Sequence, residues 1–342
     1  MKVVYTTLLF ILTLLAPVLG SAGDQDADFN RCTQFCTLQN CVTQSTYTMP
    51  LVLRLTYWTC HEDCKYRCMQ DVTTRHIMTG QPIVQYHGKW PFWRFAGAQE
   101  PASVLFSLLN LLAHWIGGSK IKRRMPDNHP MKSFYLRWSF ISINAWVWSA
   151  VFHTRGMLVR LSIFFANTIN RNTDRPTTEK LDYFSAALAI LYALYYTTIR
   201  IFQPSKHLRP LLNIVFIAVY VGHVSYLTLL PRFDYAYNIA FNLTLGLTNN
   251  LLWILYSSPR SLSFIHRFPS RPKSYRPKFV TKAGIFVLVT TAATALELFD
   301  FPPWRGIIDA HALWHLATAP IALLWYDFLL EDSLDPSWRD QK

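Results

Sequence analysis

The sequence predicts an all-α membrane protein: a seven-transmembrane helix bundle preceded by a disulfide-rich N-terminal lumenal domain. Three observations predict this fold class. Long apolar runs recur along the chain, and only 15% of its 342 residues are charged, against about 25% in soluble proteins. The chain begins with an apolar leader, and all six cysteines lie in one stretch between that leader and the other apolar runs.

The first 20 residues are typical of a cleavable signal peptide. Lys2 precedes the apolar run 3–15, and small residues follow at 20–22. A signal anchor is the alternative, but the run is short for a membrane span. We therefore expect residues 21–100 to form a cysteine-rich domain in an oxidising lumen.

The cysteines of this domain form two clusters: Cys32, Cys36 and Cys41, then Cys60, Cys64 and Cys68. An even number of cysteines in an oxidising compartment indicates a disulfide framework. Their spacing, mostly four residues, suits two helices that are stapled to each other. A zinc site is the alternative, although no CxxC pair is present. Six cysteines allow 15 pairings, so the connectivity stays open.

Residues 101–330 form the predicted membrane domain. Each of its apolar runs is close to the roughly 20 residues that cross a bilayer as a helix. The seven candidate spans are 101–118, 132–154, 183–203, 209–230, 235–257, 279–300 and 308–330. Residues 331–342 are then expected to form a tail.

Basic residues predict the orientation of these spans. They concentrate in the loops after the first, third and fifth spans: Lys120, Lys122, Arg123, Arg124, Lys206, Arg209, Arg260, Arg267, Arg271, Lys273, Arg276 and Lys278. By the positive-inside rule these loops and the tail are cytosolic, and the N-terminus is lumenal. The segment 155–180, on the lumenal side, is the exception. Because the basic residues concentrate in loops between apolar segments, the net charge of +13 does not predict a nucleic-acid partner.

Polar residues lie at the lumenal ends of three of these otherwise apolar spans. His153 ends the second span with Ser149 one turn deeper, Asp182 opens the third, and His311 and His315 open the seventh. Each pair at i and i+4 shares one helix face. An ionisable group at the centre of a span costs about 2.5–3.5 kcal/mol on insertion scales, so such residues usually have a function or a partner.

Three converging imidazoles with room for water are the ligand set of a catalytic zinc site. We predict that His153, His311 and His315 bind zinc. Asp182 would accept a proton from water or orient it, and Ser149 would donate a hydrogen bond to a developing oxyanion. A nucleophilic role for Ser149 is less favoured, because no separate base is evident beside it. The alternative to the site is an interhelical hydrogen-bond network without metal.

Three further polar residues have simpler interpretations. His114 and His223 are single intramembrane histidines, and we expect them to pack or hydrogen-bond between helices. Asp309 stands two residues before His311. It is equally a partner of the metal site or an acid at a helix N-terminus.

Further motifs cover nearly the whole mature chain: WTC (58–60), DCKY (63–66), HGKWPF (87–92), EPAS (100–103), NAW (144–146), FHTR (152–155), EKLDYF (179–184), HVSY (223–226), DAH (309–311) and WH (314–315). With these motifs the chain resembles the CREST superfamily of membrane hydrolases. Within it, the chain is most similar to the Per-one-like proteins, the post-GPI-attachment lipid-remodelling factors.

The resemblance implies a hydrolase of the endoplasmic-reticulum membrane, or alternatively the Golgi, that acts on GPI-anchored proteins. It implies removal of an acyl chain from their lipid by phospholipase A2-like ester hydrolysis. It also matches His153, His311 and His315 to the metal histidines, and Ser149 and Asp182 to the superfamily's serine and aspartate. Ceramide hydrolysis and a non-enzymatic role in GPI-protein maturation remain the alternatives.

One segment departs from the family pattern. Family members run from His-Thr-Arg directly into an Asp-initiated turn, whereas residues 156–173 here separate Arg155 from Asp174. Removing this segment restores the family spacing between His153 and Asp182. We interpret it as a retained intron in the gene model. A translated lumenal loop is the alternative.

Overall fold

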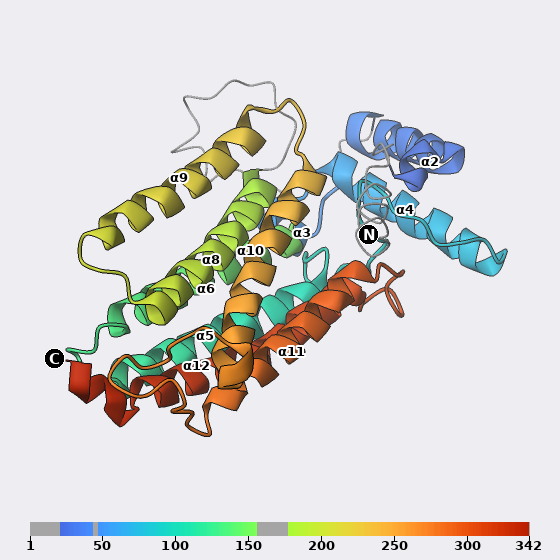
Figure 1. Cartoon of the computed structure of the whole chain (residues 1–342). Helices are drawn as coiled ribbons and strands as arrows, with labels where there is room; N and C mark the ends of the chain where they lie inside the picture. The colour runs from blue at the N-terminus through green and yellow to red at the C-terminus, as the bar shows by residue number, and fades with distance from the viewer. Residues whose placement is uncertain (1–20, 44–46, 156–176, 342) are drawn as a thin grey trace, which may run out of the picture.

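The structure is a computed structural model that describes residues 21–43, 47–155 and 177–341 (Figure 1). The signal peptide predicted at 1–20 and the inserted segment 156–173 lie outside these ranges. Helices dominate the described residues, which contain isolated β-bridges but no strand. The all-α prediction is therefore confirmed for the described part of the chain.

The N-terminal domain contains η1 (Ala22–Gln25), α2 (Ala27–Thr37), η2 (Leu38–Thr43), α3 (Leu51–Leu55) and α4 (Cys60–Met78). Side chains fix the starts of its two main helices. Asp26 accepts hydrogen bonds from the first backbone N–H groups of α2. Thr59 and Glu62 form a capping box at the start of α4.

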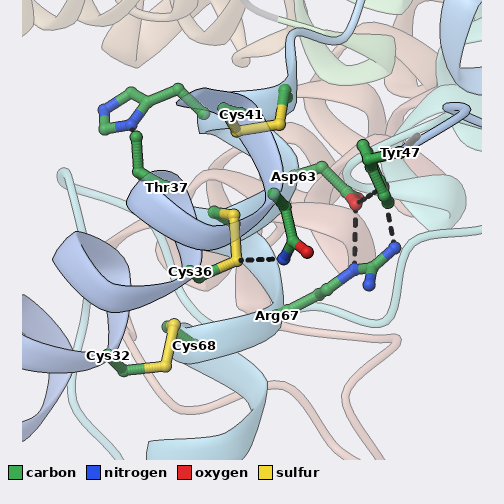
Figure 2. Close-up of a disulfide and its surroundings, with 12 residues drawn as sticks. Cys32, Cys36, Thr37, Cys41, Tyr47, Asp63, Arg67 and Cys68 are labelled. Carbon is green, nitrogen blue, oxygen red and sulfur yellow. Dashed lines mark hydrogen bonds and ion pairs between the residues drawn. A yellow bond between two sulfur atoms is a disulfide. The ribbon is translucent and has the colours of Figure 1, made fainter. Parts of the chain in front are cut away.

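Three disulfides join α2 and η2 to α4: Cys32–Cys68, Cys36–Cys64 and Cys41–Cys60 (Figure 2). The pairs are nested: the first cysteine of the first cluster pairs with the last cysteine of the second, and the last cysteine of the first cluster pairs with the first of the second. Their Cα–Cα distances of 5.7–5.8 Å are typical of disulfides. The disulfide framework is confirmed. The alternative zinc site at these cysteines is wrong, because their sulfurs are bonded to one another.

Seven long helices follow among the described residues: α5 (Pro101–Arg124), α6 (Lys132–Thr154), α8 (Thr177–Phe202), α9 (Leu208–Leu229), α10 (Tyr235–Ser257), α11 (Val280–Leu298) and α12 (Ala310–Ser333). Each coincides with one candidate span. Five of them, namely α5, α8, α9, α10 and α12, are long and apolar enough to cross a membrane, and α11 is a shorter apolar helix. The chain is thus a multi-pass membrane protein.

Six of these helices form a closed ring of contacts. α5 packs against α6 and α12, α6 against α8, α8 against α10, and α10 against α11, which returns to α12. α9 packs at the edge, against α8 (Figure 1). The N-terminal domain lies beyond one end of this bundle, which we call the domain end. The C-terminus lies at the opposite end, the distal end (Figure 1).

Two helix boundaries differ from the predicted spans. α5 continues beyond residue 118 to Arg124, and Lys122 and Arg123 join Arg124 in its last turn. Cations there are stabilised by the negative end of the helix dipole, so the helix extends through residues that were expected in a loop. α8 begins at Thr177, ahead of residue 183, so Asp182 lies inside the helix rather than before it.

The end of the chain is also more structured than a free tail. α12 extends past residue 330 to Ser333, and η4 (Pro336–Gln341) follows. Asp332 is fully buried.

The N-terminal domain is fastened to the bundle at several points. Arg155, just after α6, pairs with Glu62 of α4 and donates a hydrogen bond to the Thr56 carbonyl at 3.1 Å. The backbone N–H of Trp93 donates a hydrogen bond to the Gly306 carbonyl at 2.7 Å. Gly306 has φ +68°, and an added Cβ would lie 2.3 Å from the Trp93 ring, so glycine suits this close approach.

Candidate metal centre

Three histidines meet at the domain end of the bundle. His153 lies in the last turn of α6, while His311 and His315 lie in the first two turns of α12. The His311 Nε2 atom is 3.2 Å from His153 Nε2 and 2.8 Å from His315 Nε2. His153 and His315 are 2% and 1% exposed. One nitrogen from each ring lies within 4.8 Å of the others, so the three could hold a metal ion.

Glu100 contacts the outer ring nitrogen of His153, Nδ1. Glu100 precedes α5, and its Oε2 lies 2.7 Å from His153 Nδ1. An ionised carboxylate only accepts hydrogen bonds, so Nδ1 carries the proton and Nε2 presents its lone pair to the other histidines. Burial raises the pKa of Glu100, but Lys89 and His153 outweigh that effect and lower it below its usual value.

Ser107 of α5 contacts the outer ring nitrogen of His315, Nδ1, in a similar way. Its hydroxyl donates to the Ser103 carbonyl at 2.7 Å, so its lone pairs are left to accept. Ser149 Oγ and His315 Nδ1 each lie 3.0 Å from Ser107 Oγ. His315 Nδ1 therefore donates to Ser107, and its Nε2 lone pair faces His311. Asn110 holds the same turn, because its side chain donates to the His315 carbonyl at 2.6 Å.

The donor set fits zinc. Zinc binds imidazole at about 2.0–2.1 Å, which places tetrahedral ligand nitrogens about 3.4 Å apart. The separation of 3.2 Å between His311 and His153 is close to that spacing, and the 2.8 Å between His311 and His315 is shorter. His153 and His315 each give their outer nitrogen to a hydrogen-bond acceptor, as metal-binding histidines do.

Asp182 approaches the same cluster from a third helix. It lies in the second turn of α8, and α8 packs against α6. It interacts electrostatically with His311 and Lys89. Ser149 is linked to His315 through Ser107 rather than directly. All five residues singled out from the sequence thus belong to one region, although their individual roles stay predictions.

Glu100, Ser107 and Lys89 also belong to this region, although they were not predicted as site residues. Glu100 and Lys89 were noted only as parts of motifs. A signal for Ser107 was present, because Ser103, Ser107, Asn110 and His114 recur at helical spacing along one face of an apolar helix.

The other single polar residues pack between helices or cap them. His114 Nδ1 lies 3.0 Å from the Tyr326 hydroxyl. The His223 ring stacks on Phe241 with centroids 3.9 Å apart. Asp309 caps α12, accepting a hydrogen bond from Ala312 N at 2.8 Å.

Comparison with known proteins assigns the family. The model of the Per1-like family matches residues 50–333. The chain belongs to the Per1-like family. The resemblance drawn from the motifs is therefore confirmed.

Curated relatives cover almost the whole chain. A zebrafish (Danio rerio) protein named GPI-specific phospholipase A2-like PGAP3 is 36% identical, over 94% of this chain and 93% of its own length. The Schizosaccharomyces pombe protein PER1 homolog is 37% identical, over 95% and 92%. The Homo sapiens protein named GPI-specific phospholipase A2-like PGAP3 is 34% identical, over 92% and 90%. No solved structure matches.

Proposed function

We propose that this protein remodels the lipid of GPI-anchored proteins in the endoplasmic-reticulum membrane, or alternatively the Golgi, by removing one acyl chain. The reaction is a zinc-dependent, phospholipase A2-like ester hydrolysis. The observation that carries the proposal is the convergence of the Nε2 atoms of His153, His311 and His315. The names of the PGAP3 relatives support the choice of a GPI lipid as substrate.

In this proposal His153, His311 and His315 hold the zinc, which would supply a Lewis acid and an activated water when bound. Asp182 takes the proton of the attacking water as its oxygen adds to the ester carbonyl carbon. Ser149 rotates away from Ser107 and donates to the oxygen that becomes negative. The ester C–O bond then breaks and the leaving alcohol oxygen receives the proton, giving a free fatty acid and a lyso-lipid.

We propose that all seven long helices span the membrane and that the N-terminal domain is lumenal. The closed ring of contacts supports this topology, because α6 and α11 pack within it beside α5, α8, α10 and α12, four of the five helices that are long and apolar enough to cross a membrane. The three disulfides support an oxidising compartment for the domain.

The test is an assay of GPI lipid in cells that lack their own Per1-like protein. A GPI-anchored reporter is purified and its lipid is analysed by mass spectrometry for the lyso form. The chain should restore lyso-GPI, and His311→Ala or His315→Ala should abolish its measurable formation, because a zinc ligand is lost. His114→Gln, which changes a bundle histidine outside the cluster, should retain activity.

The same cells should also receive a version without residues 156–173, beside sequencing of the transcript across this segment. We expect the shorter version to be the more active, because a misplacement of about 1 Å at a catalytic group can cost on the order of 10²-fold. Two outcomes contradict the proposal. Release of a sphingoid base from ceramide, without lyso-GPI, would indicate a ceramidase. Restored GPI-protein maturation by the His311→Ala variant would indicate a non-enzymatic factor.

A further inference from the structure

A chain of three charged or polar side chains leads from the N-terminal domain into the histidine cluster. Lys89 pairs with Oε1 of Glu100, and Oε2 of Glu100 binds His153 Nδ1 at 2.7 Å. The Lys89 ammonium also lies over the Phe152 ring, 4.1 Å from its centroid. The Glu100 side chain is 7% exposed, so its charge depends on Lys89 and His153 rather than on water.

Lys89 sits on a short turn that the disulfide-linked domain holds from one side. Tyr86 and Lys89 exchange two backbone hydrogen bonds of 2.8 and 3.0 Å, and both residues between them have positive φ. Tyr86 packs in a small core with Phe29 and the disulfide-bonded Cys68. The turn's His87 N–H donates to Asp24 at 2.7 Å.

The opposite side of the turn is tied to the loop that leads toward α12. Trp90 Nε1 donates to Asp300 Oδ1 at 2.6 Å, and Gln85 donates to Asp300 Oδ2 at 2.9 Å. The position of Lys89 is therefore set by contacts on both sides. The N-terminal domain thus holds the Lys89 ammonium next to Glu100, whereas the side chain of an ordinary surface lysine is free to move.

We propose that Lys89 and Glu100 are positioning residues of the metal centre, through which the N-terminal domain fixes His153 for metal binding. This inference rests on the proposed zinc site. Lys89 occupies one oxygen of Glu100, which leaves the other for Nδ1 of His153. With Nδ1 held, the Nε2 lone pair of His153 stays directed at the cluster.

The test measures zinc binding by purified full-length protein, independently of catalysis. Bound zinc is counted by elemental analysis, and zinc affinity is measured by competition with a chelator. Lys89→Met and Glu100→Gln should each lower the affinity about 10- to 100-fold, the usual effect of losing the partner of a metal-binding histidine. Lys89→Arg keeps the positive charge and should recover most of the affinity.

Lys120→Met is the matched control. Lys120 lies on α5 and pairs with Asp327 of α12 at 2.8 Å, at the distal end of the same helix that Glu100 precedes. Its loss should change zinc affinity by less than about 2-fold, because neither residue touches a metal ligand or its partner.

Lys89→Met leaves a buried carboxylate without its cation and could fail to fold. The double variant Lys89→Met/Glu100→Gln removes both charges, and its affinity should match that of Glu100→Gln alone, because the two residues act in one chain. Wild-type affinity in the double variant and in Glu100→Gln would overturn the inference while leaving the zinc site in place. Wild-type protein that binds no zinc would overturn both.

Discussion

The two ends of the bundle each bury a polar cluster among apolar helices, but the two clusters are built differently. At the distal end Arg200 and Asp332, both 0% exposed, form two N–O contacts of 2.6 Å. Tyr256 donates to Asp332, and Arg200 also donates to the Arg267 carbonyl at 2.9 Å. In this cluster each hydrogen-bond donor faces an acceptor, and the Arg200 cation faces the Asp332 anion.

At the domain end three groups of the same kind face one another. The Nε2 atoms of His153, His311 and His315 meet at 2.8–3.2 Å, and two of these rings have their outer nitrogens bound by Glu100 and Ser107. Lone pairs that converge in this way attract a cation or a proton rather than one another. Burial alone therefore does not mark a functional site. A buried cluster of opposite charges stabilises the fold, whereas a buried cluster of metal-ligand groups of one kind is suited to bind a cation.

The largest effect on stability is expected at the distal end. Arg200→Met leaves Asp332 buried without a cation, and we expect a loss of about 3–5 kcal/mol in unfolding free energy. Denaturant unfolding in detergent measures it. The double variant Arg200→Met/Asp332→Leu should recover most of the loss, since no buried charge remains. Zinc bound per folded molecule should not change; if Arg200→Met lost zinc but kept its stability, the proposed division between the two ends would be wrong.

The next prediction distinguishes the roles of two serines at the domain end, Ser149 and Ser107. Ser149→Ala should lower kcat about 10²- to 10³-fold, or about 2.7–4 kcal/mol, by removing a donor to the oxyanion. Zinc affinity should stay unchanged. Ser107→Ala should instead weaken zinc binding about 10-fold or more, because Ser107 holds Nδ1 of His315. Lyso-lipid kinetics and chelator competition on both variants measure this split, and the reverse pattern would exchange the two roles.

The positions of the helices and of the histidine cluster could be predicted from the sequence. Apolar runs located the helices, because a membrane span must be apolar over about 20 residues. The histidines stood out, because ionisable residues are costly there. The start of α8 was misplaced at 183 rather than Thr177, since residues 177–182, all polar except Leu181, do not continue the apolar run. Element type followed from composition, whereas the helix ends extend into polar residues that the apolar pattern does not cover.

Pairings between residues far apart in the chain could not be predicted from the sequence. Arg200 lies inside a predicted span and Asp332 in a predicted tail, 132 residues apart, and only helix packing brings them together. The disulfide pairing is similar, because spacing left all 15 arrangements open. Glu100 and Ser107 each hold a histidine from another helix through one hydrogen bond, and the helical spacing that marks Ser107 does not identify that partner.

A third polar cluster, in the N-terminal domain, should show a smaller effect that depends on pH. Asp63 of α4 lies 2.9 Å from Arg67 and accepts a hydrogen bond from Tyr47 (Figure 2). Asp63 also lies 2.6 Å from Arg94. Burial raises the pKa of Asp63, but Tyr47 and the two arginines outweigh it and hold the pKa below its usual value. Asp63 therefore resembles the distal cluster in being an anion surrounded by donors.

A carboxyl whose pKa is lowered by folding stabilises the folded state above its unfolded pKa of about 3.9, and this contribution is lost as the pH falls through the folded value. Asp63→Asn should thus lower the melting temperature of the full-length protein at pH 7, and the difference from wild type should shrink at pH 3. Asp71→Asn, at an exposed carboxyl of the same helix, is the control and should give similar melting temperatures to wild type at both pH values. A gap between wild type and Asp63→Asn that stays constant from pH 7 to pH 3 would mean that Asp63 acts through shape and hydrogen bonding rather than through its charge.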